Sequence, residues 1–150
     1  VLMLDLDWFK QVNDRYGHEV GDRVLVHFAC LLRSSLAAGD HAARYGGEEF
    51  GALIERATEE QVRAAAQALC DAVRASPFEQ DSLTIPITVS IGVALAREGG
   101  SVEELVSIAD RRVYLAKAMG RDRVVDRTSA KRAAAAGREH ASLPLHSAVV

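Results

Sequence analysis

The chain is poor in the features that mark secreted and membrane proteins. It holds two cysteines, Cys30 and Cys70, in 150 residues, too few for a disulfide scaffold. Both lie in apolar segments with helical spacing, where we expect buried, reduced thiols. No apolar run approaches the roughly 20 residues of a transmembrane helix, and no basic segment precedes an apolar one as in a signal peptide. These absences favour a reducing compartment, the cytoplasm, without membrane contact by this segment.

Aromatic residues and excess charge are also scarce. Aromatics make up 5% of the sequence, so the core must consist mainly of Val, Leu, Ile and Ala. A net charge of −3, from 18 basic and 21 acidic residues, argues against a nucleic-acid partner. The P-loop motif GxxxxGK[ST] is missing, and His18 and His27 lack the spacing of zinc ligands. The length suits one domain with one core.

Hydrophobic periodicity predicts strands that alternate with amphipathic helices. Together with one hairpin, this predicts an α/β (α+β sandwich) fold, in which helices flank a mixed central sheet. After Asp126 the periodicity ends, so we expect 127–150 to be a flexible tail with a nascent Ala helix. The predicted elements are a buried strand over 1–6, a loop or short helix over 8–21, a helix from an N-cap at Asp22 to Gly39, a hairpin over 42–54 turning at Gly46-Gly47, a helix from a capping box at Thr58 and Gln61 to Pro77, a strand over 84–95 starting after Pro86, a helix from a capping box at Ser101 and Glu104 to Gly120, and a short strand over 123–125.

Carboxylates occur at the end of the first strand and at the hairpin turn. Asp5 and Asp7 fall on one face of the strand, where their oxygens suit Mg²⁺; the alternative is a solvated strand end. Glu48 and Glu49 follow two glycines, which let a backbone approach a ligand closely. The alternative there is a solvated tight turn.

Basic groups stand at the end of the last long helix. Lys117 and Arg121 could clamp a phosphate, the lysine as a point charge and the arginine as a bidentate fork. The alternative is that they offset the negative end of the helix dipole. Acidic groups for a divalent metal and basic groups for a polyphosphate are what metal-assisted phosphoryl or nucleotidyl transfer requires.

In their order and spacing, these motifs resemble the GGDEF domain of bacterial diguanylate cyclases, in its GGEEF variant. The resemblance covers about residues 1–126, without the family's N-terminal helix. It implies a palm-like sheet related to that of nucleotidyl cyclases and polymerases. The matching segments are DLDWFK at 5–10, NDRYGH at 13–18, Gly21-Asp22, RYGGEEF at 44–50, TVSIGVA at 88–94, Ala109-Asp110, Tyr114 and AKAMGR at 116–121.

The resemblance also implies an activity and its partners. Two GTP molecules would condense to cyclic di-GMP with release of pyrophosphate, at the interface of a homodimer in which each domain holds one GTP. An upstream sensory domain would lie outside this chain, which would then be the cytoplasmic part of a larger sensor protein. The alternative is a catalytically silent GGDEF module that binds GTP or a partner in signalling. A cyclase that makes another dinucleotide is a further alternative, against which Asp22 argues.

The resemblance assigns roles to individual residues. Asp5, the Leu6 carbonyl, Glu48 and Glu49 would hold Mg²⁺ or Mn²⁺, two ions per site, and Glu48 or Glu49 would help to deprotonate the attacking 3′-hydroxyl. Asn13 and Asp22 would read the guanine edge, because a carboxylate accepts from donors that adenine lacks. The other substrate-binding residues would be Trp8 and Phe9 through their backbone amides, Lys117 and Arg121 at the phosphates, Gly47 in the signature turn, and His18 as a support of the loop.

Four further residues complete the expectations. Tyr16 and Tyr114 should pack rather than act in the site. Many relatives carry an RxxD motif before the signature that binds product. Here Ala37 stands in place of the arginine while Asp40 is retained. We therefore expect no product inhibition at this position, and a turn role for Asp40.

Overall fold

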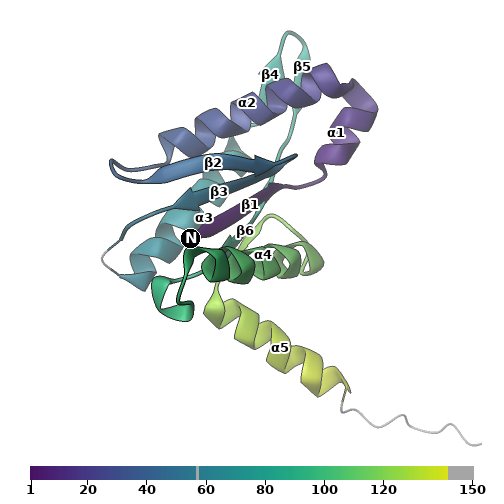
Figure 1. Ribbon diagram of the computed structural model, residues 1–150. Helices are drawn as coiled ribbons and strands as arrows, with labels where there is room; N and C mark the ends of the chain where they lie inside the picture. Colours follow the sequence, from purple (N-terminus) through teal and green to yellow (C-terminus); the bar gives the residue numbers. More distant parts are fainter. Residues whose placement is uncertain (57, 142–150) are drawn as a thin grey trace, which may run out of the picture.

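The structure is a computed structural model that describes residues 1–56 and 58–141, and it confirms a mixed sheet flanked by helices (Figure 1). The elements in chain order are β1 (Leu2–Leu6), α1 (Phe9–Tyr16), α2 (His18–Ser34), β2 (His41–Gly46), β3 (Glu49–Leu53), α3 (Glu59–Ala75), β4 (Phe78–Gln80), β5 (Leu83–Ile85), β6 (Val89–Val93), the 3₁₀ turn η1 (Ala96–Glu98), α4 (Val102–Ala118), β7 (Arg123–Val125) and α5 (Arg127–Ala141).

The first strand is the centre of the sheet. The five strands have the order β2-β3-β1-β6-β7. Strand β1 pairs antiparallel with β3 and with β6, while β7 runs parallel to β6. All residues of β1 are buried, as expected for an apolar strand with a neighbour on each side. Elements that are far apart in sequence therefore meet at the C-terminal end of β1.

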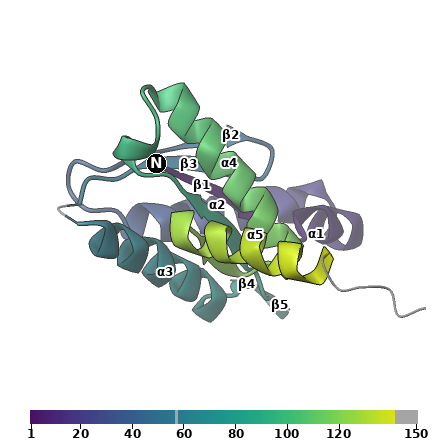
Figure 2. The same ribbon diagram turned by 90° about the horizontal axis from the view of Figure 1, so that it is seen from below.

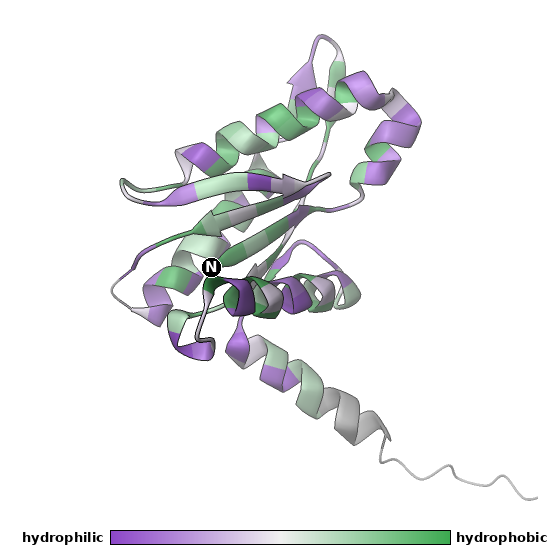
Figure 3. Ribbon diagram, viewed as in Figure 1, coloured by the Kyte–Doolittle hydropathy of each residue, from purple (hydrophilic) through white to green (hydrophobic). Residues whose placement is uncertain are grey.

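Helices cover the sheet on both faces (Figures 1 and 2). Leu2, Leu4 and Leu6 belong to the main core beneath α2 and α3. In this core the rings of Phe28 and Phe50 pack edge to face, with their centres 4.8 Å apart. Met3, the alternate residue of β1, packs in the smaller core beneath α4. This alternation follows from the two-residue period of a strand. Figure 3 shows hydrophobic residues concentrated on the strands and alternating with hydrophilic ones along the helices.

Helix α4 approaches the sheet closely at one glycine. A Cβ atom at Gly92 of β6 would lie 1.9 Å from the Ala109 carbonyl oxygen and 2.8 Å from the Val113 nitrogen. Only glycine permits this contact between a strand and a helix backbone. The close approach sets the position of α4, whose last turn carries Lys117 toward β1.

Most predicted helix ends are confirmed, but the helix predicted from Asp22 to Gly39 is wrong at both ends. Helix α2 ends at Ser34, and residues 35–40 connect it to β2. The capping box at Thr58 and Gln61 is present. Ser101 also caps its helix by accepting from the Glu104 nitrogen, whereas the Glu104 carboxylate accepts from the Gly100 nitrogen. Asp22 is not an N-cap, because α2 already begins at His18 after Gly17, whose φ of 85° breaks the preceding helix.

The main strand of the segment predicted over 84–95 starts after Pro86, as expected, but it is shorter, since β6 spans Val89–Val93. The residues before Pro86 belong to a separate strand, β5, because Pro86 has no N–H to continue a ladder. Strand β5 instead pairs with β4 in a two-stranded hairpin that the sequence did not predict. The hairpin over β2 and β3 is confirmed, as is the short strand β7.

Two side-chain orientations differ from expectation. Tyr114 is 73% exposed, because it lies one position from Val113, which faces the sheet, and the helix turns about 100° per residue. Cys30 is exposed for a similar reason, since the inward-facing residues of α2 are Phe28 and Leu32. Cys70 is buried and Tyr16 packs against the core, as predicted.

The segment after Asp126 begins as a helix. Residues 127–141 form α5, in a region where the sequence predicts a flexible tail with a nascent helix; the rest of that prediction, 142–150, lies outside the described residues. Within the described part of the chain, no helix has the length and apolar character needed to cross a membrane.

Candidate active site

The pairing of β1 with β3 brings the predicted acidic residues together. Asp5 lies opposite Glu49 in the register of the two strands, so both side chains point to the face of the sheet that carries α4. The Leu6 N–H donates to the Glu48 carbonyl oxygen at 3.3 Å, which places the signature turn beside the end of β1. Asp5 is only 5% exposed, whereas both glutamates are half-buried.

A lysine from the last long helix joins these carboxylates. Lys117 Nζ donates to Asp5 Oδ2 at 2.6 Å, although the two residues are 112 positions apart. Burial raises the pKa of Asp5, and the charges of Glu48 and Glu49 raise it further, against the opposing effect of Lys117. Asp5 thus interacts with two further acidic groups, while Lys117 pairs with Asp5 itself.

This donor set fits a hard divalent cation. Carboxylate and carbonyl oxygens are the ligands that Mg²⁺ prefers, and a cation would relieve the repulsion that acts on Asp5. Among residues 1–56 and 58–141, no three His, Cys, Asp or Glu side chains already enclose a metal position. Asp5, Glu48 and Glu49 are neighbours. To bind one ion together, their carboxylates would have to rotate toward one another.

The segment after β1 places Trp8 and Phe9 beside the second basic residue. Trp8 has left-handed backbone angles and precedes the first turn of α1. The guanidinium carbon of Arg121 lies 3.7 Å from the centre of the Trp8 ring, in a cation–π contact. The predicted phosphate-binding groups from both ends of the domain therefore stand at the same end of β1.

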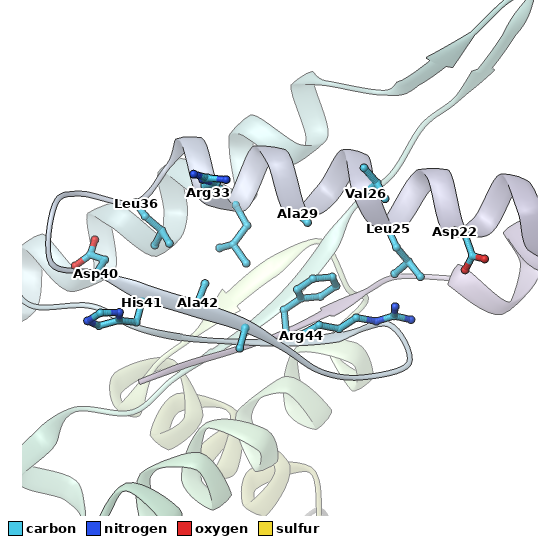
Figure 4. Close-up of a pocket in the computed structure, with 13 residues that line it drawn as sticks. Asp22, Leu25, Val26, Ala29, Arg33, Leu36, Asp40, His41, Ala42 and Arg44 are labelled. Carbon is cyan, nitrogen blue, oxygen red and sulfur yellow. The ribbon is translucent and has the colours of Figure 1, made fainter.

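The predicted guanine-reading residues lie on adjacent helices. Asn13 of α1 turns its Oδ1 atom toward Gly21 of α2, where an added Cβ would come within 1.9 Å of that oxygen. Asn13 Oδ1 is buried, and within the described residues it has no hydrogen-bond partner. Asp22 follows Gly21 and lines a cavity of about 770 Å³ between α2 and β2 (Figure 4). His18 is exposed at the start of α2.

An arginine for which we predicted no role holds the signature turn, residues 46–49. Arg44 Nε donates to the Gly47 carbonyl oxygen at 2.8 Å, and the β2–β3 register shifts between Arg44 and Gly46. Gly47 has a φ of 37°, which disfavours other residues in the turn. Arg44 and Asp22 line the same cavity (Figure 4). Its position three residues before Gly47 is the sequence signal that could have identified it.

Asp7 and Asp40 are held by contacts within the fold. The Asp7 carboxylate accepts from Ser90, Thr88 and the Asp122 nitrogen, so the prediction that pairs it with Asp5 as a cation ligand is not supported. Asp40 accepts from both terminal nitrogens of Arg56 at 2.8 Å and from the Ala37 nitrogen at 2.8 Å. The Arg56 guanidinium holds the pKa of Asp40 far below its usual range.

Comparison with known proteins gives a consistent result. The model of the family described as "Diguanylate cyclase, GGDEF domain" matches residues 1–123. Response regulator PleD of Caulobacter vibrioides is 40% identical over 131 residues, which cover 85% of this chain and 29% of PleD. The chain thus spans less than a third of that relative.

Solved structures agree with the sequence comparison. The GGDEF domain of YfiN (TpbB) from Pseudomonas aeruginosa has a TM-score of 0.80 and 34% identity, over 83% of this chain and 79% of that one. A structure described as the active GGEEF domain of a diguanylate cyclase from Vibrio cholerae has a TM-score of 0.74 and 28% identity, over 83% and 80% of the respective chains.

Proposed function

The chain belongs to the GGDEF family of diguanylate cyclase domains, and from this membership we propose that it condenses two GTP molecules into cyclic di-GMP with release of pyrophosphate. The observation that carries the proposal is the meeting of Asp5, Glu49 and Lys117 at the end of β1. Acidic groups for a cation and a basic group for a phosphate converge there from three separate elements. A silent module has no need to keep this arrangement.

Diguanylate cyclases of this family depend on a metal ion. We propose that Asp5, the Leu6 carbonyl, Glu48 and Glu49 hold Mg²⁺ or Mn²⁺ here, two ions per site. When bound, such ions neutralise phosphate charge and make the attacking hydroxyl more acidic. Glu48 or Glu49 then takes the proton of the 3′-hydroxyl, and Lys117, released from Asp5, is free to turn to a phosphate oxygen.

The substrate-binding roles follow the position of each residue. The backbone amides of Trp8 and Phe9 and the guanidinium of Arg121 face the triphosphate, while Gly47 lets the signature turn approach it. Asn13 and Asp22 hydrogen-bond the guanine edge, and His18, the first residue of α2, supports the junction with α1 at Gly17. Asn13 Oδ1 is buried against Gly21 and has no hydrogen-bond partner among residues 1–56 and 58–141, so a rotation of the side chain toward a base donor would supply one.

GGDEF relatives act as dimers. A single domain with one nucleotide site cannot join two GTP molecules, so we propose that two copies of this chain face each other across their sites. Control by a sensory domain outside this chain is part of the same proposal. It is consistent with the small share of PleD that the chain covers.

Incubation of the protein with GTP and Mg²⁺, followed by mass spectrometry of the products, tests the proposal. Cyclic di-GMP should form, and Asp5→Asn or Glu48→Gln should reduce turnover by a factor of about 100 or more while circular dichroism stays unchanged. Either variant with a near-normal rate would refute the metal assignment. A folded dimeric wild type that binds GTP without forming product would favour the silent signalling module instead.

A further inference from the structure

Asp7 is a buried acidic residue beside the site that the proposed chemistry does not use. It follows β1 directly and is 6% exposed. Its Oδ1 accepts from Ser90 Oγ at 2.7 Å, and its Oδ2 accepts from Thr88 Oγ1 at 2.8 Å and from the Asp122 nitrogen at 3.0 Å. These donors come from two segments that lie 81 to 115 positions away. The carboxylate therefore links three separate parts of the chain.

The backbone around Asp7 is strained at three non-glycine residues. Trp8 has a φ of 61°, Arg121 of 64° and Asp122 of 49°, all in the left-handed region that L-residues adopt unwillingly. Such conformations persist where surrounding contacts determine them. The Asp122 N–H that binds Asp7 belongs to the second strained residue of the 121–122 turn. Asp7 itself precedes Trp8, so it is connected to both strained segments.

The two strained segments carry the side chains that meet beside the end of β1. The central carbon of the Arg121 guanidinium lies over the Trp8 ring, 3.7 Å from the ring centre. Trp8 is 54% exposed, so buried packing around its ring does not hold it in place. The contact depends instead on where the backbone places the two residues. Asp7 accepts a hydrogen bond from the backbone of Asp122, and it is the residue before Trp8 in the chain.

We propose that Asp7 is a positioning residue that sets Arg121 against Trp8. By accepting the N–H of Asp122, which follows α4, Asp7 holds the 121–122 turn that presents the guanidinium to the triphosphate. The part of this inference that concerns the triphosphate rests on the proposed function. The part that concerns Arg121 and Trp8 does not, because it can be measured without any nucleotide.

The hydrogen bonds define what each variant should do. The Asp122 N–H can only donate, so it needs an oxygen at residue 7. Asp7→Asn keeps one oxygen for Asp122 and Thr88, and its amide can donate to the Ser90 hydroxyl, which can rotate to accept. Asp7→Ala removes every acceptor. Ser90→Ala is the matched control, since it disturbs the same carboxylate but leaves the Asp122 contact intact.

Trp8 provides the measurement, because it is the single tryptophan of the chain. Acrylamide quenching of its fluorescence reports how much of the ring Arg121 covers, and Arg121→Ala supplies the reference for an uncovered ring. Asp7→Ala should raise the quenching constant to the Arg121→Ala value. Asp7→Asn and Ser90→Ala should keep the wild-type value, although Ser90→Ala lowers the unfolding temperature.

Turnover supplies the second measurement. Asp7→Ala should raise KM for GTP about tenfold with little change in kcat, because a group that holds the substrate equally in the ground and transition states affects KM. Asp7→Asn should restore the wild-type KM. If Asp7 instead bound a metal through its charge, Asp7→Asn would lose kcat as severely as Asp7→Ala, and that result overturns the proposal.

The fluorescence outcomes decide the proposal even if GTP is not the substrate. Wild-type quenching in Asp7→Ala would show that Asp7 does not place Arg121. An increase in Ser90→Ala equal to that in Asp7→Ala would reveal general loosening rather than positioning. If Asp7→Ala does not fold, Asp7→Asn decides alone: quenching at the wild-type value supports the hydrogen-bond role, and quenching at the Arg121→Ala value refutes it.

Discussion

Replacement of Gly92 by alanine tests whether the contact between α4 and β6 constrains the fold. The added Cβ would lie 1.9 Å from the Ala109 carbonyl oxygen and 2.8 Å from the Val113 nitrogen. Both are backbone atoms of one helix, so neither can move away by a change of rotamer. The whole of α4 has to shift outward by roughly 1 Å or more to restore van der Waals separation.

The size of the effect follows from that shift. Overpacking of a core typically lowers the free energy of unfolding by 1–3 kcal/mol, and rigid backbone contacts place Gly92→Ala near the upper value, about 3 kcal/mol. For a domain of this size, we expect the midpoint of thermal unfolding to fall by about 10 °C. Displacement of α4 also draws Lys117 away from Asp5, so activity should fall even at temperatures where the variant is folded.

Gly51 gives a matched control, because Gly51 and Gly92 both lie opposite Met3 on the two strands that flank β1. A Cβ at Gly51 would lie 3.6 Å from the Met3 sulfur, an ordinary contact. Gly51→Ala should therefore be neutral or stabilise by up to about 1 kcal/mol, since it removes the flexibility of a glycine from a strand.

Urea unfolding of both variants, followed by circular dichroism, gives the comparison. The midpoint should fall for Gly92→Ala alone, with an unchanged dependence on urea concentration if the native state stays compact. Equal midpoints for the two variants would mean that α4 adjusts freely to the added methyl group. The close approach at Gly92 would then not determine the position of the helix.

Three other outcomes are expected. The wild type should strongly prefer GTP to ATP, as measured by kcat/KM for both nucleotides, and the variants Asn13→Ala and Asp22→Ala should lose that preference. Equal use of both nucleotides by the wild type would contradict the assigned base contacts. Asp40→Asn should lower the free energy of unfolding at neutral pH, as measured by urea unfolding. The difference in that free energy between wild type and variant should shrink as the pH falls below about 4, because a carboxyl with a depressed pKa stabilises the fold only while it is ionised. A difference that persists unchanged at low pH would contradict the ion pair with Arg56. The rate of the wild-type reaction should fall only as substrate is depleted, whereas Ala37→Arg, at an exposed position, should introduce inhibition by cyclic di-GMP. Strong product inhibition of the wild type would place a product site elsewhere.

The order of helices and strands could be predicted where the apolar spacing was regular. Strand β1, the hairpin of β2 and β3, and helices α3 and α4 follow from local patterns. The boundary at Asp22 was wrong, because a good N-cap residue also occurs inside helices. The predictions that Tyr114 packs and that Cys30 is buried were wrong. On a helix, a residue one or two positions from an inward-facing residue points to solvent.

The candidate site could be predicted as a set of residues but not as a set of contacts. The resemblance named Asp5 and Lys117 separately, without indicating that they form an ion pair. Nothing in the sequence near Asp7 reveals that its donors lie on β6 and after α4. Contacts over such separations depend on strand register and on the position of α4, which a one-dimensional pattern does not contain.

The central place of β1 has a consequence for biosynthesis. This strand is synthesised before the other described elements of the domain, yet one of its neighbours, β6, starts only at Val89 and the partner of Asp5 is residue 117. At roughly 5–20 residues per second, several seconds pass between these events. Over that interval the buried strand β1 has no complete sheet to join, and Asp5 lacks its lysine partner. The proposed nucleotide chemistry therefore requires a domain translated through α4, because a shorter product lacks Lys117.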